Sequence, residues 1–284
     1  MIKLLSNILN CIKKFWRNNM KLSIITINYN NKAGLQKTID SVICQTWKDY
    51  EWIVIDGGST DGSKELIEQY QQHFAYWCSE PDKGVYNAMN KGIAKAKGEY
   101  LNFMNSGDRF AADITLFNIS EYLNNWDIVY GFCRDLKTGD ITNEIAMTDI
   151  LELDVLYYNT LPHQACFFKK QLFEKVGLYR EDFKIISDWV FLVQSIVHGG
   201  ASYKFVPNDI CVYEGDGLSS DIIPLIEERQ EMMSVLFPPI LENAVRSIAS
   251  IKTIRRFRLT KISYSILFRV ACFLSRLFSK VEPY

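Results

Sequence analysis

The sequence lacks the paired cysteines and histidines that mark many metal sites. Its seven cysteines and three histidines are scattered along the chain, and no CxxC motif occurs. An odd number of isolated cysteines indicates neither a zinc site nor a disulfide framework. This cysteine usage fits a reducing compartment.

Long apolar runs are missing as well. No stretch of about 18 uncharged apolar residues exists, so a membrane-spanning helix is not expected. The N-terminal apolar run is short and interrupted, and it lacks the small-residue cleavage site of a signal peptide. No GxGxxG motif follows a predicted strand, which disfavours a dinucleotide-dependent dehydrogenase.

What is present is an ordinary globular composition of 284 residues, with 48% hydrophobic and 23% charged residues. That length accommodates one large domain, or one domain with appendages. The formal net charge of −1 conceals an asymmetry between the ends and the middle. Residues 1–21 carry five basic residues and no acid, and residues 245–284 carry nine basic residues and one acid. Basic ends around an acidic middle predict an anionic partner for the ends.

Both ends also place apolar residues near helical spacing. The pattern predicts a basic amphipathic helix over residues 1–20 and a helical tail over residues 221–284, both lying on anionic lipid. The alternatives are helices packed on the main domain, a dimer interface, or a dispensable N-terminal extension. Nucleic-acid binding is disfavoured because the basic residues lie among bulky aliphatic ones.

The middle of the chain alternates buried strands with helices. Short apolar runs without a polar alternation predict strands buried on both faces, at residues 22–27, 52–55, 76–78 and 100–104. Helical patterns separate them, at residues 35–45, 63–72 and 85–96. This order predicts an α/β fold with a mostly parallel sheet and helices on both faces.

Polar clusters follow the strands at their carboxyl ends, where such sheets bind ligands. Asp56 ends the second strand, so its carboxylate is expected to accept hydrogen bonds from a ligand. Gly57 and Gly58 let the backbone approach closely, and Ser59 or Thr60 can cap the next helix. A plain strand-to-helix turn is the alternative.

Several segments, taken in order, resemble family-2 glycosyltransferases. They are SIITINYN (23–30), TIDSVICQT (38–46), VIDGGSTDG (54–62) and EPDKGVYNAMNKG (80–92). The strongest likeness is to the branch that assembles bacterial O-antigen and colanic-acid repeat units, and it extends over about residues 22–220. The resemblance implies a Rossmann-like GT-A fold and inversion at the transferred sugar carbon. It also implies a nucleotide-binding half (21–110) and an acceptor-binding half (111–220) within a catalytic domain over residues 21–220.

The resemblance assigns nine residues to the nucleotide-sugar pocket. They are Asn28, Tyr29, Asp56, Ser59, Asp82, Lys83, Asn87, Asn90 and Asn105. Amide and cationic donors suit a diphosphate, and acceptors suit a base and a ribose. Individually, Tyr29 could be a core aromatic, Lys83 a solvated lysine, and Asn87 or Asn90 helix-surface residues.

Residues 105–108 occupy the place of the family's acidic metal-binding motif. Mg²⁺ or Mn²⁺ takes oxygen ligands from one or two carboxylates, from phosphates and from water. Only one acid is present here, so Asp108 is the expected metal ligand and Asn105 a neutral partner near the ribose or metal. The alternative is a turn that uses Asn and Gly for its geometry.

The resemblance places the catalytic base at Asp188, in a motif whose first acid is replaced by Ser187. A base there accepts the proton of the acceptor hydroxyl while its oxygen attacks the sugar. The alternative is helix capping. The resemblance also assigns His163, Gln164 and Trp189 to the acceptor or phosphate, and residues 214–220 to a mobile loop over the donor.

The resemblance implies a glycosyltransferase that moves a hexose or N-acetylhexosamine, from a UDP-linked donor by family habit, to a lipid-linked saccharide. We expect it at the cytoplasmic face of the inner membrane, in O-antigen or lipopolysaccharide synthesis, with the oligomeric state open. One alternative is a catalytically inactive module that binds sugar nucleotides or lipid. Another is a nucleotidyltransferase, although the glycine-rich basic loop it needs after the first strand is missing.

Overall fold

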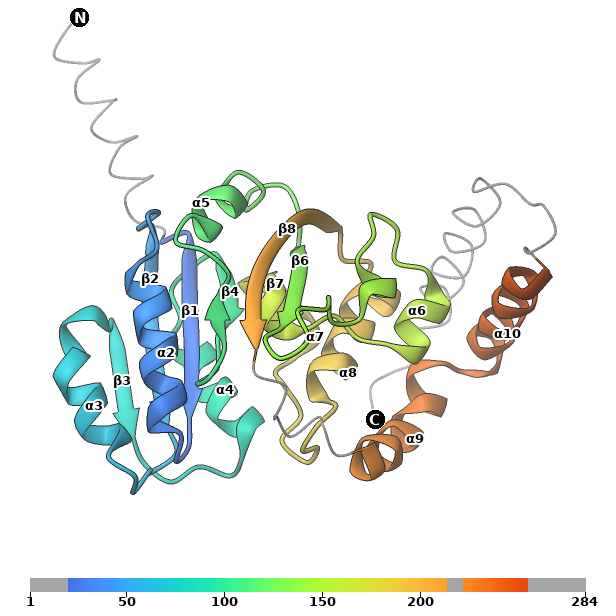
Figure 1. Ribbon diagram of the computed structural model, residues 1–284. Helices are drawn as coiled ribbons and strands as arrows, with labels where there is room; N and C mark the ends of the chain where they lie inside the picture. Colours follow the sequence, from blue (N-terminus) through green and yellow to red (C-terminus); the bar gives the residue numbers. More distant parts are fainter. Residues whose placement is uncertain (1–19, 214–221, 255–284) are drawn as a thin grey trace, which may run out of the picture.

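The computed structural model describes residues 20–213 and 222–254 (Figure 1). Three expected segments lie outside the described residues. They are the helix over residues 1–20, except residue 20 itself, the loop over residues 214–220, and the tail beyond residue 254.

One eight-stranded sheet runs through the described chain in the order β3-β2-β1-β4-β7-β6-β8-β5. The first four strands in sequence are β1 (Leu22–Asn28), β2 (Tyr50–Asp56), β3 (Tyr76–Ser79) and β4 (Tyr100–Phe103). The others are β5 (Arg109–Phe110), β6 (Ile128–Asp135), β7 (Cys166–Lys169) and β8 (Tyr203–Tyr213). Strands β1 to β4 pair in parallel, whereas β7 runs antiparallel to both β4 and β6. The predicted mostly parallel α/β sheet is confirmed, and β7 joins its two halves without a break.

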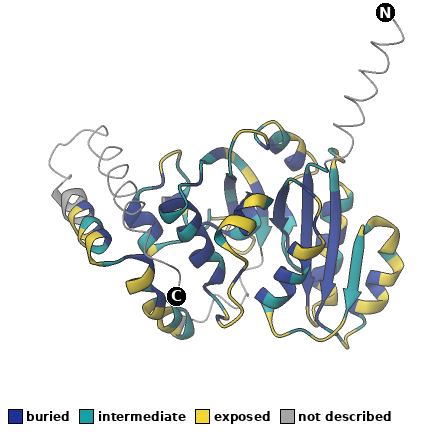
Figure 2. Ribbon diagram, turned by 180° about the vertical axis from the view of Figure 1, so that it is seen from behind, coloured by how far each residue is buried: buried dark blue, intermediate teal, exposed yellow. Residues whose placement is uncertain are grey.

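Helices cover both faces of the sheet, as predicted. On one face lie α2 (Lys32–Ile43), α3 (Ser63–Tyr70) and α5 (Thr115–Ser120). On the other lie α4 (Val85–Lys95), α6 (Leu153–Tyr158), α7 (Lys170–Val176) and α8 (Ser187–Val193). Successive strand side chains point to opposite faces, so Ile24 joins one core and Ile25 the other. Figure 2 shows the central strands in the dark blue of buried residues.

The chain continues into α9 (Ile222–Leu236) and α10 (Pro239–Ile254). Their apolar stripe is buried in the same core as Trp189, through Met232, Leu236, Phe237, Leu241, Val245 and Ile248. Residues 222–254 carry four acidic and three basic residues, so the basic part of the expected tail falls beyond them. Within residues 20–213 and 222–254, no helix is long and apolar enough to cross a membrane.

Candidate active site

The carboxyl ends of β1, β2 and β3 meet around the Asp56 carboxylate. Strand pairing places Asn28 opposite Asp56 and Asp56 opposite Ser79. Asn28 Nδ2 (2.7 Å) and Ser59 Oγ (2.5 Å) donate to Asp56 Oδ1. The Ser59 N–H (2.9 Å) and Ser79 Oγ (2.6 Å) donate to Oδ2. Asp56 is fully buried and holds four donors, so it organises this edge, while direct contact with a ligand stays a prediction.

These donors also set the ionisation of Asp56. Burial works to raise the pKa of its carboxyl, but the hydrogen bonds from Ser59, Ser79 and Asn28 outweigh it and lower that pKa below its ordinary value. Asn28 itself is 4% exposed, and its Oδ1 has no hydrogen-bond partner among the described residues. A buried acceptor left without a partner is unusual, and contact between this oxygen and a ligand stays a prediction.

Gly57 leaves a gap that Asp82 fills. A Cβ at position 57 would stand 2.6 Å from Asp82 Oδ2 and 3.2 Å from Tyr29 Cδ2. The other oxygen, Asp82 Oδ1, accepts from the Gly84 N–H at 2.9 Å. Tyr29 is 67% exposed, so it is not the core aromatic that was the alternative. Asp82 and Tyr29 thus lie together beside Gly57, and their contact with a nucleotide stays a prediction.

Helix α4 connects the two halves of the molecule through its asparagines. Asn90 exchanges two hydrogen bonds with the backbone of Tyr179, at 2.8 and 3.1 Å. Asn90 Nδ2 and Asn87 Nδ2 also donate to Glu181, at 2.9 and 2.8 Å. The expected donor contacts of both asparagines stay predictions, but their amide groups are occupied in this structure. Glu181 was not predicted, because an acid in a loop gives no sequence signal.

The turn after β4 carries the metal-motif residues. Thr38 Oγ1 fixes this turn by donating to the Asp108 carbonyl (2.7 Å) and accepting from the Gly107 N–H (3.1 Å). Asn105 Oδ1 is buried without a partner among the described residues. One carboxylate and one unpartnered amide oxygen on the same turn fit a Mg²⁺ or Mn²⁺ ion that takes its remaining ligands from a diphosphate and water. In residues 20–213 and 222–254, no three His, Cys, Asp or Glu residues gather as a complete metal site.

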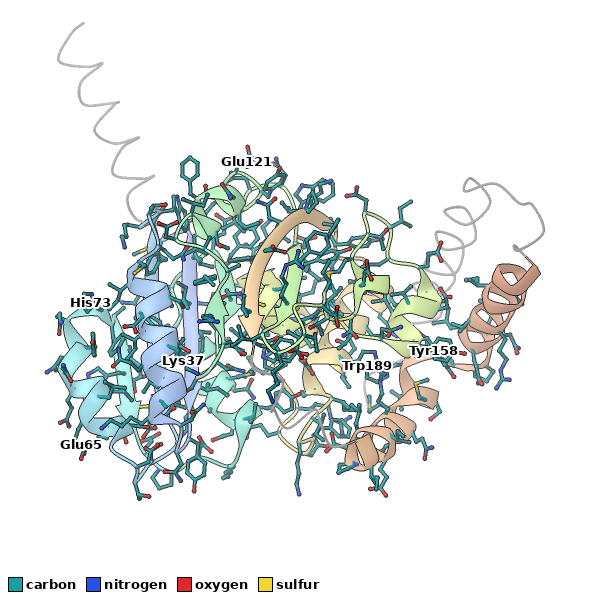
Figure 3. The ribbon with its side chains drawn as sticks, in the orientation of Figure 1. Lys37, Glu65, His73, Glu121, Tyr158 and Trp189 are labelled. Atoms are coloured by element: carbon teal, nitrogen blue, oxygen red, sulfur yellow. The ribbon has the colours of Figure 1, made fainter. Side chains whose placement is uncertain are left out.

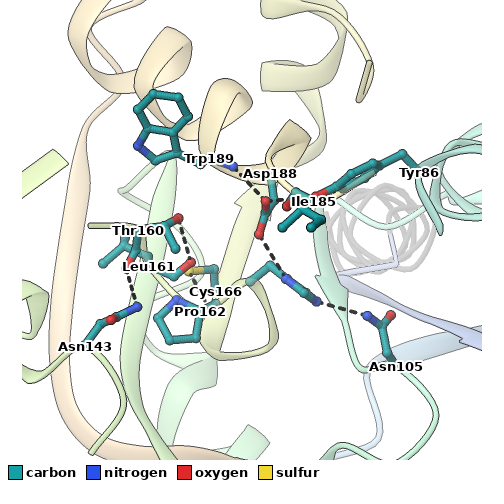
Figure 4. A network of polar contacts seen from close by, with 11 residues as sticks. Tyr86, Asn105, Asn143, Thr160, Leu161, Pro162, Cys166, Ile185, Asp188 and Trp189 are labelled. Atoms are coloured by element: carbon teal, nitrogen blue, oxygen red, sulfur yellow. Dashed lines mark hydrogen bonds and ion pairs between the residues drawn. The ribbon is translucent and has the colours of Figure 1, made fainter. Parts of the chain in front are cut away.

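Asp188, the expected base, lies in the first turn of α8 and is held from three sides (Figure 4). Its Oδ1 accepts from the Tyr86 hydroxyl at 3.0 Å and from the Trp189 N–H at 2.9 Å. Its Oδ2 lies 3.2 Å from His163 Nδ1. The other ring nitrogen, His163 Nε2, lies 3.0 Å from Asn105 Nδ2. A polar chain thus runs from the metal-motif turn to the expected base.

The Asp188 carboxylate changes the pKa of the His163 ring. Burial works to lower its pKa, but the hydrogen bond and the charge of Asp188, followed by the charge of Asp108, raise that pKa above the ordinary value. Nδ1–H donates to Asp188, which orients the ring. Sequence reasoning assigned both residues to the site but did not predict that they touch.

The family profile described as "Glycosyl transferase family 2" matches residues 23–177. The chain belongs to that family. An uncharacterized glycosyltransferase of Mycobacterium tuberculosis (strain CDC 1551) is 38% identical over 178 residues, which cover 61% of this chain and 68% of that protein. A PGL/p-HBAD biosynthesis glycosyltransferase of Mycobacterium bovis (strain BCG) is 27% identical over 209 residues, covering 71% and 80%.

Solved structures support the fold of this family-2 glycosyltransferase. S. aureus TarS 1-349 in complex with UDP superimposes with a TM-score of 0.63 at 17% identity, covering 78% of this chain and 66% of that one. The mannosyltransferase PcManGT from Pyrobaculum calidifontis, in complex with GDP-Man and Mn²⁺, gives 0.60 at 16% identity, covering 92% and 88%. The chain therefore spans about two thirds of the TarS chain, and at these identities the likeness establishes the GT-A fold alone.

The remaining expected acceptor residues of this glycosyltransferase differ in placement. Trp189 is 2% exposed, and its Nε1 donates to the Leu156 carbonyl at 2.8 Å. Gln164 is half-buried, and its backbone carbonyl accepts from Asn102 Nδ2 at 2.9 Å. Trp189 thus supports the site from the core, and acceptor contact by either side chain stays a prediction.

Gly57→Ala is expected to weaken nucleotide binding by displacing Asp82. A methyl group 2.6 Å from Asp82 Oδ2 forces that carboxylate out of the gap, and we expect the Kd for UDP to rise about tenfold, the loss of one good hydrogen bond. Isothermal titration calorimetry measures it. The matched test is the double-mutant cycle with Asp82→Ala. If the two effects simply add, Gly57 does not act through Asp82 and this reading of the gap is wrong.

Proposed function

We propose that this glycosyltransferase inverts the anomeric centre as it moves a hexose or N-acetylhexosamine from a nucleotide sugar to a lipid-linked saccharide, in bacterial surface polysaccharide synthesis. The placement of Asp188 is the observation that carries the proposal. Its carboxylate lies at the start of α8 in the second half of the sheet, joined through His163 to the Asn105 turn. A single-displacement transfer requires a carboxylate near the bound donor, and this chain of contacts supports that role for Asp188.

The two oxygens of Asp188 have different surroundings. Oδ1 accepts from two donors, the Tyr86 hydroxyl and the Trp189 N–H, whereas among the described residues Oδ2 contacts His163 alone. Oδ2 is therefore the oxygen proposed to take the proton of the acceptor hydroxyl. As that proton transfers, the hydroxyl oxygen forms a bond to the anomeric carbon, and the bond to the nucleoside diphosphate breaks. His163 Nδ1–H keeps the carboxylate oriented during the step.

The donor side supplies binding and charge. Asp82 and Tyr29, which face the Gly57 gap, are proposed to hold the base, and Lys83 the diphosphate. Asp108 and Asn105 would hold the divalent cation, which, when bound, neutralises charge on the departing diphosphate. Because two protein ligands are too few for tight binding alone, the cation is expected to bind together with the nucleotide.

The names of similar proteins support the substrate classes. TarS structures are described with UDP and with UDP-GlcNAc, and PcManGT with GDP-Man. A relative in Bacillus subtilis is described as a putative teichuronic acid biosynthesis glycosyltransferase. A lipid-linked acceptor also agrees with the basic ends of the sequence, which we propose bring the enzyme to the cytoplasmic face of the membrane.

A donor panel tests this proposal. UDP- and GDP-sugars are incubated with the enzyme, Mn²⁺ or Mg²⁺, and a membrane lipid extract as acceptor, and released nucleotide is measured. We expect one donor to turn over, metal to be required, and NMR of the product to show inversion. Retention of configuration would contradict the assignment of Asp188 as a base.

The inactive-module alternative has one observation in its favour, the single acid of the 105–108 turn. It predicts nucleotide binding without turnover of any donor in the same assay.

A further inference from the structure

Glu228 of α9 binds the backbone that leads into the Asp188 helix. Its Oε1 accepts from the Lys184 N–H at 2.8 Å, and its Oε2 accepts from the N–H groups of Ile185 (2.9 Å) and Ile186 (3.2 Å). Three successive amides thus converge on one carboxylate. Hydrogen bonds to an ionised acceptor are stronger than those to a neutral one, so this contact fixes residues 184–186 just before α8 begins.

Residue 185 of this segment is also held by Tyr86 of α4. The Tyr86 hydroxyl lies 2.6 Å from the Ile185 carbonyl and 3.0 Å from Asp188 Oδ1. Ile185 therefore has its N–H on Glu228 and its carbonyl on Tyr86. A shift of Ile185 would therefore displace the Tyr86 hydroxyl, which also contacts the Asp188 carboxylate.

Arg229, the next residue of α9, holds the second part of this region. Its guanidinium carbon lies 4.3 Å from the centroid of the Trp189 ring. Its two terminal nitrogens donate to the carbonyls of Tyr158 (2.8 Å) and Asn159 (3.2 Å), where α6 ends. Tyr158 and Trp189 are both labelled in Figure 3, on the side of the molecule that carries α9 and α10. Glu228 and Arg229, which are adjacent in α9, thus contact the segment before α8 and the end of α6.

The position of α9 is itself fixed by burial. Met232, Leu236 and Phe237 are 3%, 1% and 1% exposed, and the Phe237 ring stacks near Trp189 at a centroid distance of 6.3 Å. Burial of such side chains stabilises a helix in one register. Glu228 and Arg229 are consequently presented from a rigid support.

We propose that Glu228 and Arg229 form a brace that positions the Asp188 carboxylate, so that α9 is part of the catalytic unit. The inference rests on the proposed role of Asp188 as the base. Both brace residues lie outside residues 23–177, the segment that the family profile matches. Neither touches the reacting atoms in this arrangement, so both are positioning residues. Misplacement of a catalytic group by about 1 Å can cost about a hundredfold in rate.

The test compares Glu228→Gln with Glu227→Gln, an identical change at the neighbouring, exposed position of the same helix. Backbone amide exchange is followed by NMR at residues 184–186 and at Trp189, whose N–H donates to Asp188 Oδ1. We expect Glu228→Gln to speed exchange at all four amides and to lower kcat about 10- to 100-fold, with the donor KM changed less than about twofold. Glu227→Gln leaves all three measurements unchanged.

Other outcomes separate the possible failures. Faster exchange at residues 184–186 with an unchanged kcat would overturn the brace and leave Glu228 a merely structural residue. Unchanged exchange at Trp189 would show that the contact does not reach Asp188. Failure of the proposed function is distinguishable, because the wild type would then lack turnover while the exchange difference between the two variants persists. If Glu228→Gln does not fold, Glu228→Asp, which keeps the charge but shortens the reach, replaces it.

Discussion

Asp188→Asn is expected to lower kcat for sugar transfer by about 10²- to 10⁴-fold, the range for removal of a general base. The amide keeps the shape of the side chain, and its oxygen still accepts from Tyr86 and Trp189. The variant loses the basic oxygen, so the acceptor hydroxyl can no longer transfer its proton. Donor turnover measured at saturating donor and acceptor gives kcat, and calorimetry gives nucleotide affinity, which we expect to change less than about twofold.

The control for this experiment is Asp182→Asn. Asp182 lies on the same segment, is exposed, and forms a surface ion pair with Arg180. Exposed ion pairs contribute little to stability, so this change should leave both kcat and stability near wild-type values. A kcat for Asp188→Asn within about threefold of the control would remove the base from the proposed mechanism.

Asp56→Asn is expected to destabilise the half of the sheet formed by β1 to β4. In the wild type each carboxylate oxygen accepts two hydrogen bonds. An amide group turns one of those acceptors into a donor that faces two other donors. Buried donors without partners cost about 1–3 kcal/mol each, so we expect the free energy of unfolding to fall by about 3 kcal/mol or more. Urea denaturation at neutral pH measures this loss.

Asp61→Asn is the matched control, because Asp61 belongs to the same loop and accepts from Ser63 and Lys32 while exposed to water. The pH dependence gives a second check. The pKa of Asp56 is lowered on folding, so its stabilising contribution is present at neutral pH and is lost as pH falls through the folded-state pKa. The difference in the free energy of unfolding between wild type and Asp56→Asn should therefore become smaller at acidic pH. An equal loss for both variants would mean that burial of Asp56 is unimportant.

The half of the sheet formed by β1 to β4 followed closely from the sequence. Its strands are short, mostly apolar runs, so a local pattern predicts β1 to β4 within two residues. Asp56 was found because it ends a predicted strand just before two glycines, and Asp82 because its segment resembles a family motif. What no pattern indicated was that Gly57 makes room for Asp82, since that contact joins loops 25 residues apart.

The second half was less predictable. Helices α5, α6 and α7 have six or seven residues each, too few for a clear helical period. For α9, an apolar stripe at helical spacing fits a membrane surface and a protein core equally well. Tertiary contacts decide between them, and Leu236 and Phe237 lie in the core. Glu181 and Glu228 each stand next to a second acid in the sequence, and only the folded chain shows which amides they meet.

The unbroken sheet sets a limit on how this fold can be shortened or recombined. Strand β8 pairs in parallel with β6 through most of its length, yet it begins 26 residues after the family profile ends at residue 177. A chain cut at that point would expose one edge of β6, and bare strand edges readily recruit other chains. The segment that the family profile matches, residues 23–177, therefore lacks β8, which the complete sheet requires. Exchange of this fold between relatives would therefore have to carry residues 178–213 along with the segment that the profile matches.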